Sequence, residues 1–324
     1  MTISLNHPII KKSQSLIALF LLCLFISLLS DKFMTSTNFW NVLRQISVNV
    51  CISVGMTLVV LMAGIDLSVG SILGLTAAIC AGVLKNGIIF QSLDLLVGFT
   101  VLGAILAALL IGLLLGLFNG WVITKFSIPP FVATLAMLTI GRGLTMLYTE
   151  GIPISNLGPK FEFIGSGWIL GIPVPVWISL FMVLIVVFLT NKTTFGRYIY
   201  AIGGNEKAAF LSGININKIK LAVYGIAGIM AAVGGILVTS RLNSAQPNAG
   251  MSYELDSIAA VVIGGTSLSG GVGTVTGTVI GAIIIGVLNN GLVLLDVSPF
   301  WQQVVKGIVI LLAVIIDKMN QKNK

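Results

Sequence analysis

The sequence predicts an all-α polytopic membrane protein with about ten transmembrane helices, and two observations carry this prediction. Of its 324 residues, 56% are hydrophobic and only 9% are charged, and the mean hydropathy is +1.07. A soluble globular chain carries about a quarter charged residues. Several apolar runs also reach the roughly 20 residues that a helix needs to cross a bilayer. We expect a single transmembrane domain over residues 1–324, with some short or broken helices and two weakly related halves.

The longest water-compatible segment runs from Asn191 to Lys220 and fixes the expected topology. It holds five basic residues and a single acid, Glu206. Short loops rich in Lys and Arg stay on the cytoplasmic side, so this loop is expected there together with both basic termini. The formal charge of +8 is therefore an orientation signal, and we expect no nucleic-acid partner. With both termini on one side, the number of crossings is even.

The apolar segments follow one another along the whole chain. The first, Gln14–Ser30, lacks a small-x-small cleavage site at its end, so we expect a retained span rather than a signal peptide. A polar connection, Phe33–Gln45, comes next. The other expected spans are Ile46–Ala63, Ser68–Leu84, Leu93–Thr124, Pro129–Tyr148, Ile172–Thr190, Leu221–Thr239, Thr274–Leu295 and Val304–Ile316.

Two of the apolar segments are irregular. Leu93–Thr124 is longer than one crossing, and it fits either one tilted helix or a helix with an extra interfacial turn. Ser257–Gly265 is too short to cross, and such segments occur at membrane depth only where they are buried in protein or line a cavity. Small residues that favour close helix packing recur every fourth position, at Gly70, Gly74, Ala78 and Gly82 and at Gly112, Gly116 and Gly120.

A faint internal repeat underlies the expected two halves. Val59–Gly70 and Ala260–Gly271 each contain an apolar run followed by Gly-x-x-Leu-Ser-x-Gly. Transporter halves often share such traces. Coincidence is the other explanation, because the chain contains 37 glycines.

Within the polar loop, local signals predict a short helix. Gly203–Asn205 is a turn signal, and Asn205 is a suitable N-cap for a helix over Glu206–Leu211, which has an acid in its first turn. Ser212–Gly213 ends it, because glycine commonly follows a helix end. Such a helix either docks into a groove on another protein or merely joins two spans.

Three motifs, in this order, resemble those of the permeases of bacterial ABC importers. The first is Gly64–Gly70, which reads Gly-Ile-Asp-Leu-Ser-Val-Gly. The second is the Glu-x-Ala-Ala of Glu206–Ala209, followed four residues later by Gly213. The third is Tyr253–Asp256, leading to the Gly- and Ser-rich Gly264–Gly271. The resemblance covers most of the chain and is strongest to the sugar-importing branch of this family.

The resemblance implies a function, partners and coupling residues. The chain would be the membrane-spanning subunit of an importer in the bacterial inner membrane, taking up a monosaccharide, with ribose as the expected sugar. Implied partners are a second copy of the chain, a cytoplasmic subunit that binds ATP and Mg²⁺, a periplasmic sugar-binding protein and membrane lipid. No cofactor is expected on this chain itself. The loop that couples to the ATP-binding subunit would comprise Gly196, Arg197, Gly204, Asn205, Glu206, Ala208, Ala209, Ser212 and Gly213.

No catalytic or metal site is expected. The only histidine, His7, lies in the N-terminal tail, far from any candidate nucleophile. The chain has no Gly-x-x-x-x-Gly-Lys-[Ser/Thr] phosphate loop, so ATP would have to bind another polypeptide. Cys23, Cys51 and Cys80 lie in apolar runs without metal-ligand spacing and are expected as packing residues.

Polar residues inside apolar runs are the candidates for a sugar pathway or gate. Asp66 either lies at the mouth of the pathway or caps the next helix, the capping role being favoured. Arg142 either meets a sugar or a carboxylate, or extends towards the interface. Lys306 is expected to anchor its helix at the interface. Asparagines suit either weak sugar contacts or helix-to-helix hydrogen bonds. The pathway candidates are Asp66, Ser68, Asn49, Arg142, Asn289 and Asn290.

A secondary transporter driven by an ion gradient is the alternative. Broken helices near Gly64–Gly70 and Gly265–Gly273 fit it equally well, and Asp66 would then carry a proton. The loop that resembles a docking element and the scarcity of carboxylates in the membrane favour the ATP-driven importer.

Overall fold

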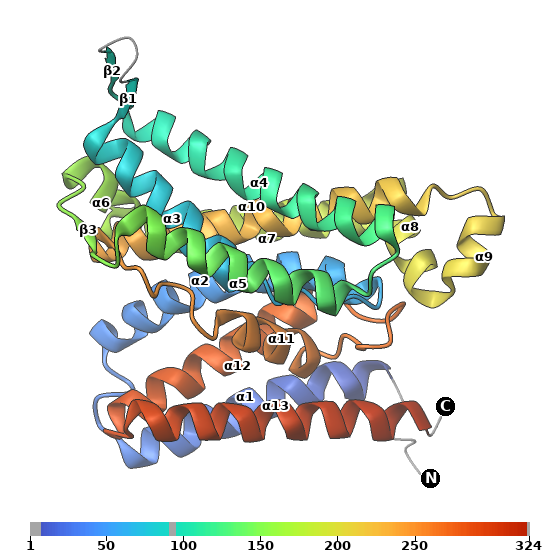
Figure 1. The fold of residues 1–324 in the computed structure, drawn as a ribbon. Coiled ribbons are helices and arrows are strands. Elements are labelled where there is room, and N and C mark those ends of the chain that lie inside the picture. Colours follow the sequence, from blue (N-terminus) through green and yellow to red (C-terminus); the bar gives the residue numbers. More distant parts are fainter. Residues whose placement is uncertain (1–7, 91–94, 323–324) are drawn as a thin grey trace. The chain divides into compact units, whose positions relative to one another are not determined.

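The computed structural model describes residues 8–90 and 95–322 of the 324-residue chain, and almost all regular structure within them is helical (Figure 1). The elements in order are α1 (Pro8–Leu29), α2 (Ser36–Leu61), α3 (Val69–Asn86), β1 (Ile88–Phe90), β2 (Leu95–Val97), α4 (Val101–Phe126), α5 (Pro130–Thr149), β3 (Ile154–Ser155), α6 (Pro159–Ser166), β4 (Trp168–Ile169), β5 (Ile172–Pro173), α7 (Val174–Lys192), α8 (Thr194–Gly204), α9 (Glu206–Leu211), α10 (Ile216–Leu242), β6 (Ser244–Ala245), α11 (Tyr253–Ile263), α12 (Val275–Leu294) and α13 (Pro299–Lys322).

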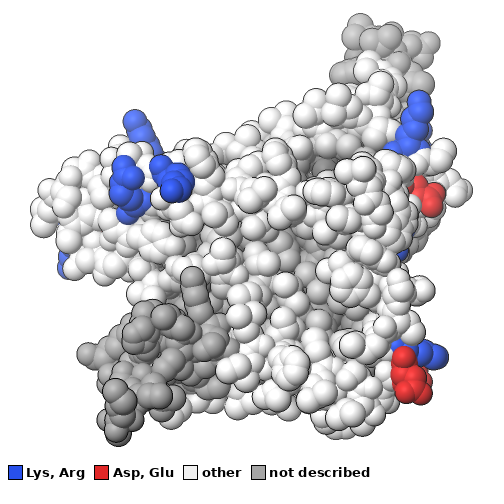
Figure 2. Space-filling view, turned by 180° about the vertical axis from the view of Figure 1, so that it is seen from behind, with Lys and Arg blue, Asp and Glu red and all other residues white. Residues whose placement is uncertain are grey.

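Seven helices within these described residues are long and apolar enough to cross a membrane, namely α2, α3, α4, α5, α7, α10 and α12. The apolar stretches of α1 and α13 are shorter. Figure 2 shows that charged side chains are sparse on the face drawn, as contact with lipid requires. The predicted all-α polytopic membrane protein is confirmed, whereas the total of about ten crossings stays a prediction.

Two predicted boundaries are wrong. The expected polar connection Phe33–Gln45 is helical from Ser36, because the Thr35 hydroxyl caps α2 by accepting from the Asn38 N–H at 3.3 Å. The long apolar stretch before Thr124 contains strand β2, which pairs with β1 in an antiparallel hairpin, followed by the single 26-residue helix α4. Leu93 itself lies outside the described residues.

The helices form two compact units, neither of which is continuous along the chain. Unit 1 comprises Met1–Gly64, Val183–Ile214 and Leu255–Lys324, and unit 2 comprises Ile65–Met182 and Asn215–Glu254. Helix α7 passes from unit 2 into unit 1. The expectation of one permease domain over the whole chain stays a prediction.

Unit 2 is built on α3, α4 and α10, which pack against one another, with α5 on α3 and α6 on α10. The predicted glycine stripe on α4 makes this packing close. A Cβ atom on Gly112 would lie 2.6 Å from the carbonyl oxygen of Gly228, and one on Gly120 would lie 2.8 Å from the Cα of Leu221. The stripe therefore joins two helices of the same chain.

Helix α4 shows how the sequence divides protein from lipid. Its buried residues include Ala104 and Ala108, which precede the buried Gly112 at intervals of four. Large leucines such as Leu106 and Leu110 are 56% and 55% exposed, as expected for side chains that face lipid. Small residues thus face the protein, and large apolar residues cover the outside.

In unit 1, α12 packs against both α1 and α2, and α2 also contacts α8. Buried hydroxyls add a polar link between α2 and α12, because Thr57 Oγ1 donates to Thr278 Oγ1 at 2.7 Å. Most of α2 is buried inside the protein. Unit 1 is therefore organised around α2 and α12.

Candidate functional site

Helix α9 in the polar loop forms as its local signals predict. The Asn205 Oδ1 accepts the Ala208 N–H at 3.0 Å at the helix start. At its end, Gly213 has a φ of +83°, and the Ile214 N–H donates to the Ala209 carbonyl at 3.1 Å. This left-handed closure favours glycine. The predicted bounds, Glu206–Leu211, are confirmed.

Large apolar side chains of α9 are exposed. Phe210 and Leu211 are 68% and 84% exposed, whereas Ala209 is buried. Glu206 and Ala208 are also on the surface. An exposed apolar pair beside a basic loop is typical of a surface that binds another protein.

A second loop helix, α8, is not predicted by the sequence, because Gly203 and Gly204 resemble a turn. Thr193 caps α8 by accepting the Gly196 N–H at 3.4 Å. A Cβ atom on Gly196 would overlap the Thr190 carbonyl. Glycine there lets α8 begin directly against the last turn of α7. Gly204 is the last residue of α8, and Arg197 is exposed on it.

Within unit 1, α8 contacts both the end of α2 and the Gly-rich loop before α12. A Cβ atom on Gly203 would overlap the Leu61 carbonyl and lie 2.5 Å from the Gly271 nitrogen. The Gly271 N–H itself donates to the Leu61 carbonyl at 2.9 Å. The Gly-rich part of the third motif, through Gly271, therefore meets α8 at the end of α2, backbone against backbone.

A tyrosine adds a second attachment of α8 to that loop. The Tyr200 hydroxyl donates to the Gly273 carbonyl at 2.9 Å. Burial raises the pKa of Tyr200, so the hydroxyl keeps its proton and remains a donor. This contact has no local sequence signal, because 73 residues separate the two groups.

In unit 2, Asp66 belongs to a buried hydrogen-bonded group. Its Oδ1 accepts from the N–H of Ser68 at 2.8 Å and from the Ser68 hydroxyl at 2.6 Å. Asn119 donates to that hydroxyl at 2.9 Å. These contacts agree with the capping alternative, while a pathway role for Asp66 and Ser68 stays a prediction.

Arg142 interacts electrostatically with the carboxylate of Glu254, as one alternative anticipated, and it also contacts backbone carbonyls that neither alternative anticipated. Its Nη1 donates to the carbonyl of Ala249 at 2.7 Å and is 3.4 Å from that of Pro247. Both carbonyls belong to the non-helical segment between β6 and α11. Buried backbone carbonyls outside helices need such partners. Arg142 therefore stabilises this segment within unit 2.

Asn290 pairs with another asparagine. Its Nδ2 donates to the Asn38 Oδ1 at 2.9 Å, and the Asn38 Nδ2 donates back to the Asn290 Oδ1 at 3.0 Å. Both side chains are buried between α2 and α12. These bonds are the helix-to-helix hydrogen bonds that were one of the two alternatives for the asparagines. Asn49 is also buried in α2, and pathway roles for both candidates stay predictions.

The asparagine pair leads to a stability prediction. Asn38→Leu or Asn290→Leu alone should lower the stability of the detergent-solubilised chain by about 1–3 kcal/mol, because each leaves one buried amide without its partner. The double variant should lose less than the sum, because it removes both polar groups. Thermal unfolding measures this. Fully additive losses would show that the two amides do not depend on each other.

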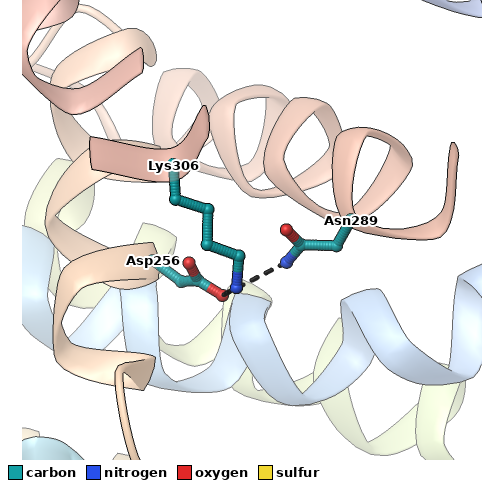
Figure 3. Close-up of polar contacts among 3 residues, drawn as sticks. All are labelled: Asp256, Asn289 and Lys306. Atoms are coloured by element: carbon teal, nitrogen blue, oxygen red, sulfur yellow. Dashed lines mark hydrogen bonds and ion pairs between the residues drawn. The ribbon is translucent and has the colours of Figure 1, made fainter. Parts of the chain in front are cut away.

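The remaining polar cluster lies in unit 1 and joins three helices (Figure 3). Lys306 Nζ of α13 lies 3.0 Å from Asp256 Oδ2 of α11, and Asn289 of α12 donates to the same oxygen at 3.2 Å. The ammonium of Lys306 is paired with a carboxylate inside the unit, a partner that the sequence did not predict, while its expected role as an interfacial anchor stays a prediction. The sequence offered one signal: a lysine within an apolar helix requires an opposite charge nearby.

No three His, Cys, Asp or Glu side chains in the described part of the chain are grouped as metal ligands. The cysteines carry free thiols, and Cys51 and Cys80 are buried. Cys80 lies in an apolar cluster with Ala104 and Phe161 in unit 2. The two buried thiols act as small packing residues.

Comparison with known proteins finds a matching family and several similar proteins. Residues 38–314 match the family described as "Branched-chain amino acid transport system / permease component". The ribose import permease RbsC of Bacillus subtilis is 52% identical over 312 residues, covering 96% of this chain and 94% of that protein. RbsC of Haemophilus influenzae is 50% identical, covering 94% of this chain and 93% of its own.

A third relative extends the same pattern. RbsC of Escherichia coli K12 is 48% identical over 320 residues, covering 96% of this chain and 95% of that protein. No solved structure gives a significant match. Because the family model spans most of the chain and these relatives align almost end to end, the chain belongs to this family of multi-pass membrane transport permeases.

Proposed function

We propose that this chain is the membrane-spanning subunit of an ATP-binding-cassette importer that brings ribose, or a closely similar monosaccharide, into the cytoplasm. The observation that carries the proposal is the near full-length similarity to three ribose import permeases. The family description names branched-chain amino acids, so the choice of sugar rests on the relatives.

The proposed importer contains two copies of this chain, a cytoplasmic subunit that hydrolyses ATP with Mg²⁺, and a periplasmic sugar-binding protein. This chain would bind no cofactor and catalyse no reaction itself. It would lie in the bacterial inner membrane with both termini and the basic loop in the cytoplasm. The excess of Lys and Arg in that loop supports this orientation.

Coupling to ATP hydrolysis would begin at α9. Its exposed Phe210 and Leu211 suit a groove on the ATP-binding subunit. Movement of α9 would reach α8 directly, because Asn205 both ends α8 and caps α9. From α8 it would pass to the end of α2 and the Gly-rich loop through the backbone contacts of Gly203. Contacts of this kind transmit displacement because no flexible side chain lies between them.

The polar residues at membrane depth are proposed to line or gate the sugar pathway. Most of them already bond to protein groups, which suits a pathway that contacts sugar weakly and releases it. These candidates are Asn49, Asp66, Ser68, Arg142, Asn289 and Asn290.

Gentle purification of the tagged chain from its native membrane tests the proposal. An ATPase should co-elute, and the complex in liposomes should import ribose only with ATP and the sugar-binding protein. A chain that elutes alone and takes up ribose under an ion gradient without ATP would contradict it. That result would favour the secondary transporter.

A further inference from the structure

The polar cluster of Asp256, Asn289 and Lys306 in unit 1 joins three helices by polar contacts (Figure 3). The side chain of Asp256 is 4% exposed and that of Lys306 is 21% exposed. Each residue comes from a different helix, and 50 residues separate the two charges in the chain. The cluster is thus a tertiary feature.

The cluster lies well below the helix ends. Asn289 is five residues before the end of α12 and Lys306 is seven after the start of α13, and the two helices are joined by only four residues. At about 1.5 Å per residue, these positions are about 8 Å and about 10 Å from the joined ends. The two helices therefore deliver their polar groups to the same depth, within their apolar portions.

The two charges of an ion pair in this apolar setting depend on each other. Either charge alone in an apolar setting is unfavourable, so loss of one partner acts on the other. Asn289 donates to the same Asp256 oxygen that receives Lys306, which orients the carboxylate. The amide oxygen of Asn289 is buried and accepts no hydrogen bond within the described residues. The Asn289 side chain is therefore oriented by the hydrogen bond that its amide nitrogen donates to Asp256.

Helix α11 is buried from Asp256 to Val262 and also packs closely on α12, because a Cβ atom on Gly281 would overlap the Ala260 carbonyl. It is 11 residues long and has non-helical chain at both ends. Its C-terminal end leads directly into the Gly-rich loop, whose Gly271 bonds to Leu61 and whose Gly273 accepts from Tyr200 of α8. The position of α11 therefore affects the position of the loop that contacts α8.

We propose that the Asp256–Lys306 ion pair, oriented by Asn289, positions α11 and thereby keeps movement of α8 coupled to the membrane part of unit 1. Asp256 and Lys306 are positioning residues, and Asn289, which is also a pathway candidate, orients their pair. This inference rests on the proposed importer function for its transport readout. It requires opposite charges at the two sites, since an apolar pair of similar size often preserves stability without fixing one arrangement.

The test compares charge removal with charge exchange. Asp256→Asn and Lys306→Met should each lower ribose uptake per ATP hydrolysed by about tenfold in the reconstituted complex, because the remaining group loses its partner. The double variant Asp256→Lys with Lys306→Asp should recover to within about threefold of the parent, because the attraction is restored. Lys306→Arg should retain coupling. Lys318→Met is the matched control, since it removes a charge from an exposed site on the same helix.

A second readout does not depend on transport. A cysteine at Leu255, which is 44% exposed, reports the setting of α11 through its alkylation rate by a maleimide, in a chain with Cys23→Ser. Charge removal should change this rate by about threefold or more, and charge exchange should restore it.

Three results would overturn the inference. The first is an exchange variant that inserts normally yet stays as impaired as the single variants in both readouts. The second is an unchanged alkylation rate in Lys306→Met. The third is full recovery of uptake by Asp256→Leu with Lys306→Leu, which would show a packing role only. If the parent complex imports no ribose, the proposed function fails, and the alkylation rates alone decide the position of α11.

Discussion

Gly213→Asp is expected to reduce ribose uptake to background while the chain still inserts into the membrane. Gly213 closes α9 with a φ of +83°, and its N–H donates to the Phe210 carbonyl at 2.9 Å. Aspartate would place a negative charge at a helix C-terminus, where the dipole disfavours it by about 0.3–1 kcal/mol. The same carboxylate would be exposed beside Phe210 and Leu211, on the surface proposed to enter the ATP-binding subunit.

Gly213→Asn is the matched control. Asparagine has nearly the same shape, tolerates the left-handed region, and carries no charge. It should retain most of the uptake and still co-purify with the ATPase, whereas the aspartate variant should lose the ATPase. Normal uptake by Gly213→Asp at an equal amount in the membrane would remove α9 from the coupling route.

Gly203→Ala is expected to lower uptake by at least about tenfold and to destabilise unit 1 by about 1–3 kcal/mol. The added methyl group would overlap the Leu61 carbonyl and crowd the Gly271 nitrogen. These are backbone atoms already bonded to each other at 2.9 Å, so neither can move aside without breaking that bond. Uptake in cells and thermal unfolding in detergent measure the two effects.

Gly204→Ala serves as the control for the fold, because a Cβ atom there meets nothing within 4 Å. It adds the same methyl group one residue further along α8 and should leave the melting temperature unchanged. Equal destabilisation by the two variants would mean that the contact of Gly203 with Leu61 is unimportant, since alanine forms helix more readily than glycine and propensity alone would stabilise both variants.

The sequence predicted α9 to the residue because its signals are local. Asn205 caps the helix three residues from its bonding partner, and Gly213 closes it within one turn. The membrane class could also be predicted from the sequence, since hydropathy is a property of each residue. The start of α2 could not be predicted from hydropathy, because Ser36 begins a helix in a polar stretch. The Thr35 cap sets that start.

The composition of α8 pointed the wrong way. Gly203 and Gly204 resemble a turn, yet both are helical. Gly203 is needed because backbone atoms of Leu61 and Gly271 occupy the space of its side chain. That requirement comes from residues more than 60 positions away, so no local pattern contains it. Close approach and turn formation both favour glycine, and the sequence alone does not separate them.

The polar residues at membrane depth could be selected from the sequence, but their partners could not. Arg142 bonds to the carbonyls of Ala249 and Pro247, and Lys306 pairs with Asp256. Each partner lies 50 or more residues away. The physical rule that such groups need partners predicts that a contact exists. Identifying the partner group requires knowledge of the fold.

The interleaving of the two units has a consequence for biosynthesis. The chain changes unit after Gly64, Met182, Ile214 and Glu254, so both units are left unfinished until late in synthesis. More than 200 residues separate the end of α2 from the start of α12, its main partner in unit 1. At about 5–20 residues per second, α2 waits about 11–46 s in the membrane before Asn290 can reach Asn38. A ribosome that stalls before α12 therefore leaves a nascent chain in which the Asn38 amide keeps its bond to the Phe33 carbonyl but lacks its partner on α12.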